Sequence, residues 1–277
     1  MLRFGITIDG NEKVETFLKL LELSCMGRRK HLLFTARTDC LIIYHQSVSA
    51  LQRTEMFEVR MYPGECFTHY VFEYDEVNEL TFEVVAENLR QTLLSLPEQT
   101  DILTLKLAMI QGEPALQIRV ADDEWGYDLG VEMRTEVDME DHLIPESTQS
   151  SLSFTFPNSD HLRALLTSVR YLGVKVVTVS ANTSGYVEFK GGASVTHVNV
   201  SVPDVAVQVR NAGEETSVES VMSASVDVRA FVNFIRLVAA SAQFVEIVIV
   251  DQTSARIEIH KTDCVFTLYL SHQTIND

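Results

Sequence analysis

The sequence predicts an α+β fold of two tandem domains, each with antiparallel sheets and two helices on one face. Two observations support this prediction: a strand-helix-strand-strand-strand order recurs along the chain, and a polar stretch, 137–151, separates the recurring units into pairs. Units with one helix among four strands exclude a doubly wound parallel sheet, in which helices and strands alternate. We therefore expect an N-terminal domain at 1–136, a connector at 137–151 and a C-terminal domain at 152–277.

The recurring unit is clearest in the second half of the chain. Alternating apolar residues predict strands, and an apolar period near 3.6 predicts helices over 160–171 and 228–240. Turn-forming residues occupy corresponding places, 182–185 in one unit and 251–254 in the next. The predicted strands of these two units are 152–156, 174–180, 185–190, 196–202, 221–226, 244–250, 254–260 and 265–271.

The first half of the chain contains the same order of elements. A helix is expected over 86–96, and the first unit begins with a strand at 2–8 and a helix at 12–23. The strands expected around the second helix are 80–84, 102–109, 115–120 and 128–133. Four units in two pairs are what two similar domains require.

Composition restricts the kind of function that is possible. The 277 residues are 46% hydrophobic, which is enough to bury full cores. Acidic residues outnumber basic ones 39 to 22, and a net charge of −17 argues against a surface that attracts phosphate everywhere. The four cysteines form no C-x-x-C pair and residues 1–10 do not read as a signal peptide, so we expect a reducing intracellular environment.

Basic residues recur with the same spacing on the two helices of the second half. Each helix has an apolar stripe, and a basic-polar-basic set falls on another face at steps of four and three residues. The two sets are Arg163, Thr167 and Arg170, and Arg229, Asn233 and Arg236. Exposed arginines can serve solubility alone, but the repeated spacing indicates a local site for anions.

The first half shows a weaker basic pattern. Arg28, Arg29 and Lys30 follow the first helix, and Arg90 lies near Glu87 on the second. Cations at the end of a helix also complement its dipole, so the first cluster fits a structural role as well as phosphate contact.

Motifs for catalysis are missing from the sequence. The eight histidines show no H-E-x-x-H or comparable metal spacing, and neither G-x-S-x-G nor a phosphate-binding G-x-x-x-x-G-K-[ST] occurs. We therefore expect no enzyme activity, no metal and no cofactor. A carboxylate site of the kind that nucleases use stays open as an alternative.

Taken together, these features resemble the sliding-clamp family, which includes the proliferating cell nuclear antigen, over nearly the whole chain. Within that family the segments VMSASVDVRAFVNFIRL at 221–237 and 152–190, which starts LSFTFP and ends SANTSGYVEFK, are similar to the Hus subunit of the heterotrimeric checkpoint clamp, the nine-one-one complex. The opening MLRFGITIDG and the ending FTLYLSHQTIND also fit that subunit.

This resemblance implies a ring of three subunits that closes head to tail through edge strands and surrounds double-stranded DNA without sequence preference. It implies Rad9-type and Rad1-type clamp subunits as partners, loading by a separate clamp loader, a nuclear location, and recruitment of repair and checkpoint proteins. The alternatives are a homotrimeric replication processivity clamp, a two-domain metal-dependent nuclease, and a protein-interaction scaffold that does not bind DNA.

The resemblance also assigns residues to these roles. The expected DNA contacts are Arg163, Arg170, Arg229 and Arg236, followed by Arg28, Arg29 and Arg90. The expected contacts with recruited proteins, in the connector, are Leu143, Ile144 and Pro145. The expected edge strands at the subunit interface are Ala115, Leu116, Gln117, Ile118, Arg119 and Val120, and Tyr186, Val187, Glu188, Phe189 and Lys190.

Overall fold

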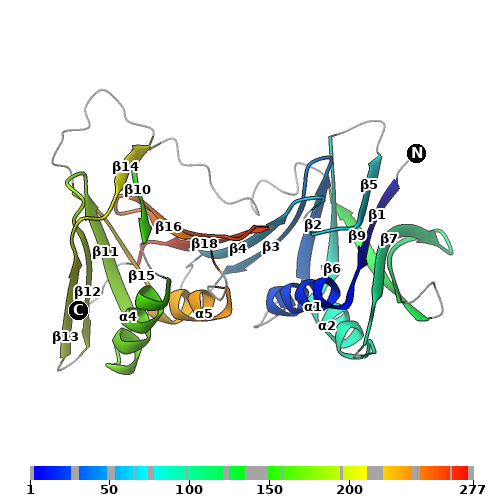
Figure 1. The fold of residues 1–277 in the computed structure, drawn as a ribbon, viewed down its shortest axis with the longest axis horizontal. Coiled ribbons are helices and arrows are strands. Elements are labelled where there is room, and N and C mark those ends of the chain that lie inside the picture. The colour runs from blue at the N-terminus through cyan, green and yellow to red at the C-terminus, as the bar shows by residue number, and fades with distance from the viewer. Residues whose placement is uncertain are drawn as a thin grey trace. The chain divides into compact units, whose positions relative to one another are not determined.

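The computed structural model shows a chain of antiparallel strands and paired helices (Figure 1). It divides into two compact units: residues 1–45, 58–143 and 262–264 form the first, and the rest of the chain forms the second. The residues it describes are 3–25, 31–48, 54–64, 66–73, 78–97, 99–120, 125–134, 149–156, 159–193, 196–210, 221–238, 242, 244–262 and 264–273.

The first unit is built on a single run of antiparallel strands. They pair in the order β3-β2-β6-β9-β8-β7-β1-β5, and helices α1 and α2 pack against each other. The elements up to residue 134 are β1 Arg3–Asp9, α1 Asn11–Cys25, β2 His31–Arg37, β3 Leu41–Val48, β4 Thr54–Met61, β5 His69–Glu73, β6 Glu79–Val85, α2 Ala86–Leu94, β7 Ile102–Ile110, β8 Glu113–Val120 and β9 Trp125–Arg134.

The second unit contains two antiparallel sheets and two helices that pack together. One sheet has the order β14-β10-β16-β17-β18 and the other β13-β12-β11-β15. Its elements are β10 Ser151–Phe156, α4 Ser159–Tyr171, β11 Val176–Asn182, β12 Val187–Ala193, β13 Thr196–Val202, β14 Val207–Arg210, β15 Val221–Asp227, α5 Val228–Val238, β16 Phe244–Val250, β17 Ser254–His260 and β18 Cys264–Ser271.

The two repeats of a unit exchange their first strands. In the second unit β10, which begins one repeat, pairs with β16 of the other, with Leu152 opposite Ile249. In return β15 pairs with β11, with Val226 opposite Val177. The first unit has the same exchange, because β1 pairs with β7 and β6 pairs with β2. The predicted α+β fold, with antiparallel sheets and two helices per domain, is confirmed.

Two of the predicted edge strands lie inside their sheets. Strand β8, which contains Ala115–Val120, is hydrogen-bonded to β7 on one side and β9 on the other. Strand β12 is hydrogen-bonded to β11 and β13, and Tyr186 precedes it. The expectation that 115–120 and 186–190 are sheet edges is therefore wrong, since their backbone groups are already paired within the chain.

Parts of the predicted organisation fall outside the described residues. They include most of the connector, 137–148, and with it Leu143, Ile144 and Pro145; Arg28 and Arg29 lie outside as well. Among the helices that the structure describes, none combines the length and apolar character needed to cross a membrane.

Candidate nucleic-acid interface

Helix α4 presents cations on an exposed face beside its buried stripe. Leu162, Leu166 and Val169 are almost fully buried against the core of the second unit. Arg163 and Arg170 lie about a quarter of a turn around the helix from this stripe, and both side chains are exposed. Their spacing of seven residues places them two turns apart on the exposed face.

Helix α5 repeats this arrangement on a more strongly apolar stripe. Phe231 and Ile235 are completely buried, whereas Arg229, Asn233 and Arg236 are exposed. The helix begins where the Asp227 carboxylate accepts a hydrogen bond from the Ala230 N–H at 2.9 Å, which satisfies one of the unpaired donors of the first turn. This cap holds the start of α5, and with it Arg229, in place.

A side-chain hydrogen bond joins the exposed faces of the two helices. The Arg170 Nη1 of α4 donates to Asn233 Oδ1 of α5 at 3.3 Å. Because Asn233 is four residues after Arg229 and three before Arg236, all three α5 side chains share one face. The structure therefore brings Arg170, Arg229 and Arg236 together on one surface.

Arg170, Arg229 and Arg236 have charges that are available to an anion from outside the protein. Arg163 forms an ion pair with Asp160, one turn earlier in α4, at 2.8 Å. None of the ion pairs between described residues involves Arg170, Arg229 or Arg236. Arg163 is thus partly neutralised within its own helix, and the other three are not.

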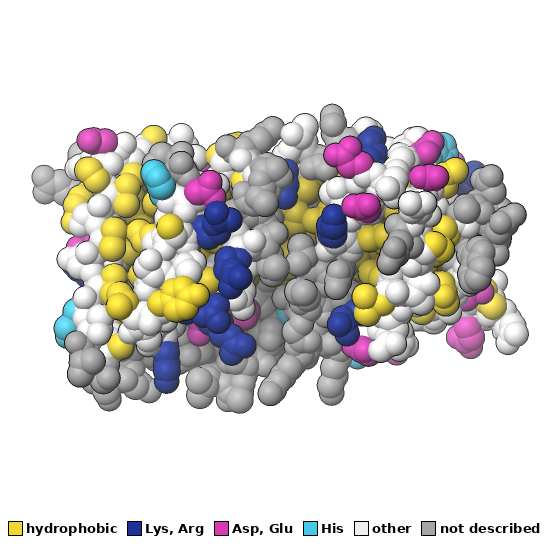
Figure 2. Space-filling model, turned by 60° about the horizontal axis from the view of Figure 1, so that its bottom comes forward, with side chains coloured by type: hydrophobic (Ala, Val, Ile, Leu, Met, Phe, Trp, Pro, Cys, Tyr) yellow, Lys and Arg dark blue, Asp and Glu magenta, His cyan; other side chains and the backbone are white. Residues whose placement is uncertain are grey.

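Lys175 is a fourth member of this surface that the sequence pattern did not reveal. It lies just before β11, and its carbonyl oxygen accepts the first N–H of α5, that of Val228, at 2.9 Å. The register that places Val176 opposite Asp227 brings this exposed lysine next to the start of α5. We refer to Arg170, Lys175, Arg229 and Arg236 as the basic cluster. In Figure 2, Lys and Arg side chains gather in a band over the region of α4 and α5.

Two cations on the helices of the first unit are balanced locally. Lys19 lies 3.3 Å from Glu15 on α1, and Arg90 lies 3.9 Å from Glu87 on α2. These pairs are one turn apart on their own helices, so each cation already has a carboxylate neighbour. The candidate Arg90 therefore sits in a different electrostatic setting from the basic cluster.

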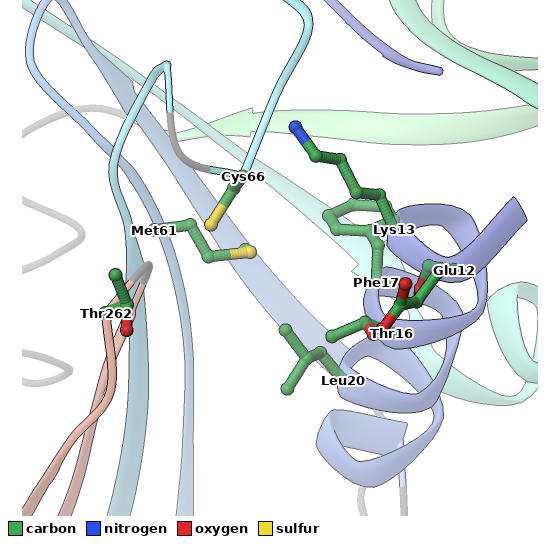
Figure 3. Close-up of a pocket in the computed structure, with 8 residues that line it drawn as sticks. All are labelled: Glu12, Lys13, Thr16, Phe17, Leu20, Met61, Cys66 and Thr262. Carbon is green, nitrogen blue, oxygen red and sulfur yellow. The ribbon is translucent and has the colours of Figure 1, made fainter. Parts of the chain in front are cut away.

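The first unit also contains a pocket of about 390 Å³ beside α1 (Figure 3). In the close-up, Met61 and Cys66 lie on one side of the pocket and the α1 side chains on the other. The residues around it are Glu12, Lys13, Thr16, Phe17, Leu20, Met61, Cys66 and Thr262. This set supplies one carboxylate and one ammonium group, without a carboxylate pair or an imidazole, and gives no basis for a hydrolytic site.

One group of possible metal ligands occurs among the described residues. Glu246, Glu258 and His260 have ligand atoms within 4.8 Å of one another on β16 and β17. Arg210 forms an ion pair with Glu246, and Arg256 lies 2.8 Å from Glu258. The charge of both carboxylates is therefore already balanced, and the group is explained as a network of ion pairs among β14, β16 and β17 of one sheet.

The predicted interface residue Lys190 has a local partner as well. Its ammonium group lies 2.7 Å from the Glu188 carboxylate on the same face of β12, and this hydrogen bond raises the pKa of Lys190.

Comparison with solved structures defines the class of fold. The crystal structure of the Proliferating Cellular Nuclear Antigen from Entamoeba histolytica matches with a TM-score of 0.65, covering 99% of this chain and 100% of that one at 13% identity. The chain thus has the fold of a DNA sliding clamp. The family model for Hus1-like protein matches residues 2–274, so the chain belongs to the Hus1-like protein family. A comparison with curated protein sequences gave no match.

Proposed function

We propose that this chain is one subunit of the heterotrimeric checkpoint sliding clamp, a non-catalytic protein that encircles double-stranded DNA and recruits checkpoint and repair proteins to it. The observation that carries the proposal is the basic cluster: three exposed arginines on two adjoining helices, with the exposed Lys175 beside the start of α5, in a chain whose net charge is −17. Arginine and lysine contacts to phosphate are blind to base sequence, and an acidic remainder discourages binding elsewhere. The Hus1-like family and the clamp fold supply the context.

Ring closure requires strands whose backbone groups are available to another subunit. Strand β13 is at the end of its sheet and pairs, among the described strands, with β12 alone. In the first unit, residues 125–130 of β9 pair with β8, while the contact of β9 with β6 covers 131–134. We assign β13 and the first half of β9 as the edges that pair head to tail with neighbouring subunits.

The other parts of the proposal follow from the family. The partner chains are Rad9-type and Rad1-type subunits, a separate clamp loader places the ring on DNA, and the protein acts in the nucleus. Leu143, Ile144 and Pro145 remain the proposed contacts for recruited proteins, and Arg28, Arg29 and Arg90 remain secondary DNA contacts.

The test is the mass of the purified protein in solution, alone and after co-expression with Rad9-type and Rad1-type chains, measured by light scattering. A one-to-one-to-one complex that retains circular DNA and releases it on linearisation supports the proposal. A homotrimer of the chain alone would instead identify a replication processivity clamp. Cleavage of DNA that depends on Mg²⁺ or Mn²⁺ and is lost in Glu246→Gln/Glu258→Gln would identify a nuclease.

A further inference from the structure

Helix α4 ends in an aromatic side chain that is almost fully exposed to solvent. Tyr171 is 87% exposed and the adjoining Leu172 is 49% exposed. Apolar residues on a helix of this unit otherwise point into the core, as Leu162, Leu166 and Val169 do. The ring of Tyr171 therefore contributes little to the fold and is available to a ligand.

The backbone holds this aromatic residue in a defined position. The Leu172 N–H donates to the Ser168 carbonyl at 3.1 Å, and the Gly173 N–H donates to the Arg170 carbonyl at 3.0 Å. Gly173 has a φ of 81°, the left-handed conformation that commonly ends a helix and that glycine adopts without strain. Tyr171 is thus presented by a capped helix end.

The neighbours of Tyr171 are cationic or polar. Arg170 precedes it and is tied to Asn233 of α5, and Lys175 follows four residues later beside the start of that helix. An apolar docking surface for a protein helix would need several contiguous apolar side chains, and among the exposed large apolar residues of the described ranges only Leu172 adjoins Tyr171 in sequence. An exposed ring bordered by cations is the combination by which proteins bind unpaired nucleotides: the cations hold phosphates and the ring stacks on a base.

We infer that Tyr171 stacks on an unpaired nucleobase of DNA whose backbone is held by the basic cluster. This inference rests on the proposed function, because it requires DNA at α4 and α5. In an intact duplex both faces of each base are covered by neighbouring pairs, so a ring at a helix end finds a base face only at a gap, a frayed end or a single-stranded junction. Tyr171 accordingly makes the subunit favour such DNA over continuous duplex.

The experiment measures the affinity of the protein for two labelled DNAs by fluorescence anisotropy. One DNA is a short duplex and the other is the same duplex with a gap of a few nucleotides. The protein is the full chain together with the subunits that co-purify with it. Tyr171→Ala is expected to weaken binding to the gapped DNA by about 5- to 100-fold and to leave binding to the intact duplex within about two-fold. Tyr171→Phe is the matched control and keeps the wild-type preference, because stacking uses the ring and not the hydroxyl. A 2-aminopurine placed in the gap is quenched by wild type and Tyr171→Phe and not by Tyr171→Ala.

Four outcomes overturn the inference. Equal affinity of wild type and Tyr171→Ala for gapped DNA excludes stacking, and an equal loss on both DNAs shows a contact with duplex instead. Unchanged DNA binding combined with weaker binding of a co-purified protein assigns the ring to a protein partner. Failure of the wild-type assembly to bind either DNA refutes the proposed function itself, and the inference falls with it.

Discussion

Replacing Arg229 and Arg236 by alanine is expected to make DNA binding markedly less sensitive to salt. Both side chains are exposed, lie on one face of α5 and form no ion pair with a described residue, so each can hold a phosphate. Each phosphate contact contributes about 0.9 to the slope of log K against log salt concentration. The double variant should therefore lower the magnitude of this slope by about 1.8.

The corresponding change in affinity is large enough to measure directly. A four-fold rise in salt weakens binding about 3.5-fold per contact, hence about 12-fold for two contacts. The assay is a series of anisotropy titrations with a random-sequence duplex at increasing salt. Arg163→Ala should change the slope by clearly less than 0.9, because the Asp160 carboxylate already competes for that guanidinium.

A control removes two positive charges from other elements, although Lys190, unlike the two arginines, is paired with Glu188. Lys106→Ala/Lys190→Ala also deletes two exposed cations, one on β7 and one on β12, and is expected to leave the slope unchanged. If the Arg229→Ala/Arg236→Ala slope equals that of wild type, or if the control changes it equally, the basic cluster is not the DNA contact. Circular dichroism should show that both variants retain the native fold.

Three further predictions concern the stability of the fold: two in the second unit, which carries the cluster, and one in the first. Asp227→Ala should lower the free energy of unfolding by about 1 kcal/mol in urea titrations, because it removes the cap of α5, while Asp227→Asn should retain most of it. Phe231→Ala should lower the free energy of unfolding by about 3–5 kcal/mol in the same assay, because this ring is completely buried. Arg229→Ala, at an exposed position of the same helix, should change it by less than about 0.5 kcal/mol. Burial raises the pKa of the Cys40 thiol from 9.0 to about 11, so the unfolded chain loses this proton at lower pH than the folded chain does. The stability that Cys40 contributes is therefore complete below pH 9 and is lost as pH rises toward 11. Cys40→Ala should make the free energy of unfolding depend less on pH in this range.

Each of these results can contradict its physical reason. An unchanged unfolding free energy in Asp227→Ala would mean that water replaces the cap at no cost. A loss below about 1 kcal/mol in Phe231→Ala would show that the core collapses around the deletion. A Cys40→Ala profile that falls as steeply as wild type between pH 9 and 11 would assign the alkaline loss to other groups, of which Tyr70 is the first candidate because burial also raises its pKa.

The repeated order of elements was accessible from the sequence because it depends on local periodicity. The strands 196–202, 244–250 and 254–260 and both helices of the second unit appear close to their predicted bounds. Strands β2 to β5 and β14 were not predicted, although β2, β3 and β4 follow α1 in the same order in which β11, β12 and β13 follow α4, and β5 and β14 hold corresponding places in the two units.

The neighbours of a strand could not be predicted in the same way. Alternation of apolar residues shows which side chains face the core, but it carries no information on which strand pairs with which. Strands β8 and β12 alternate as an edge strand would, and only the observed pairing shows that both are interior.

The candidate site was predicted in part for the same reason. The helical spacing of Arg229, Asn233 and Arg236 is a local signal, and it identified one exposed face correctly. Lys175 lies outside a helix, and its place beside α5 depends on the pairing of β11 with β15, which comes from the other repeat. The Arg170–Asn233 hydrogen bond depends on helix packing and had no sequence signal.

The exchange of first strands between repeats has a consequence for how the chain folds. A repeat that gives β10 to its neighbour and receives β15 cannot complete a sheet alone, so the two repeats of the second unit should fold in one all-or-none step. Solenoid repeats, by contrast, gain stability one at a time and tolerate added copies. In this chain, inserting or deleting a single repeat would leave its first strand without a partner strand. Repeats can therefore be added only in pairs. Pairing between segments so distant in sequence also makes nucleation slow, and an incomplete chain would expose open strand edges until its second repeat had formed.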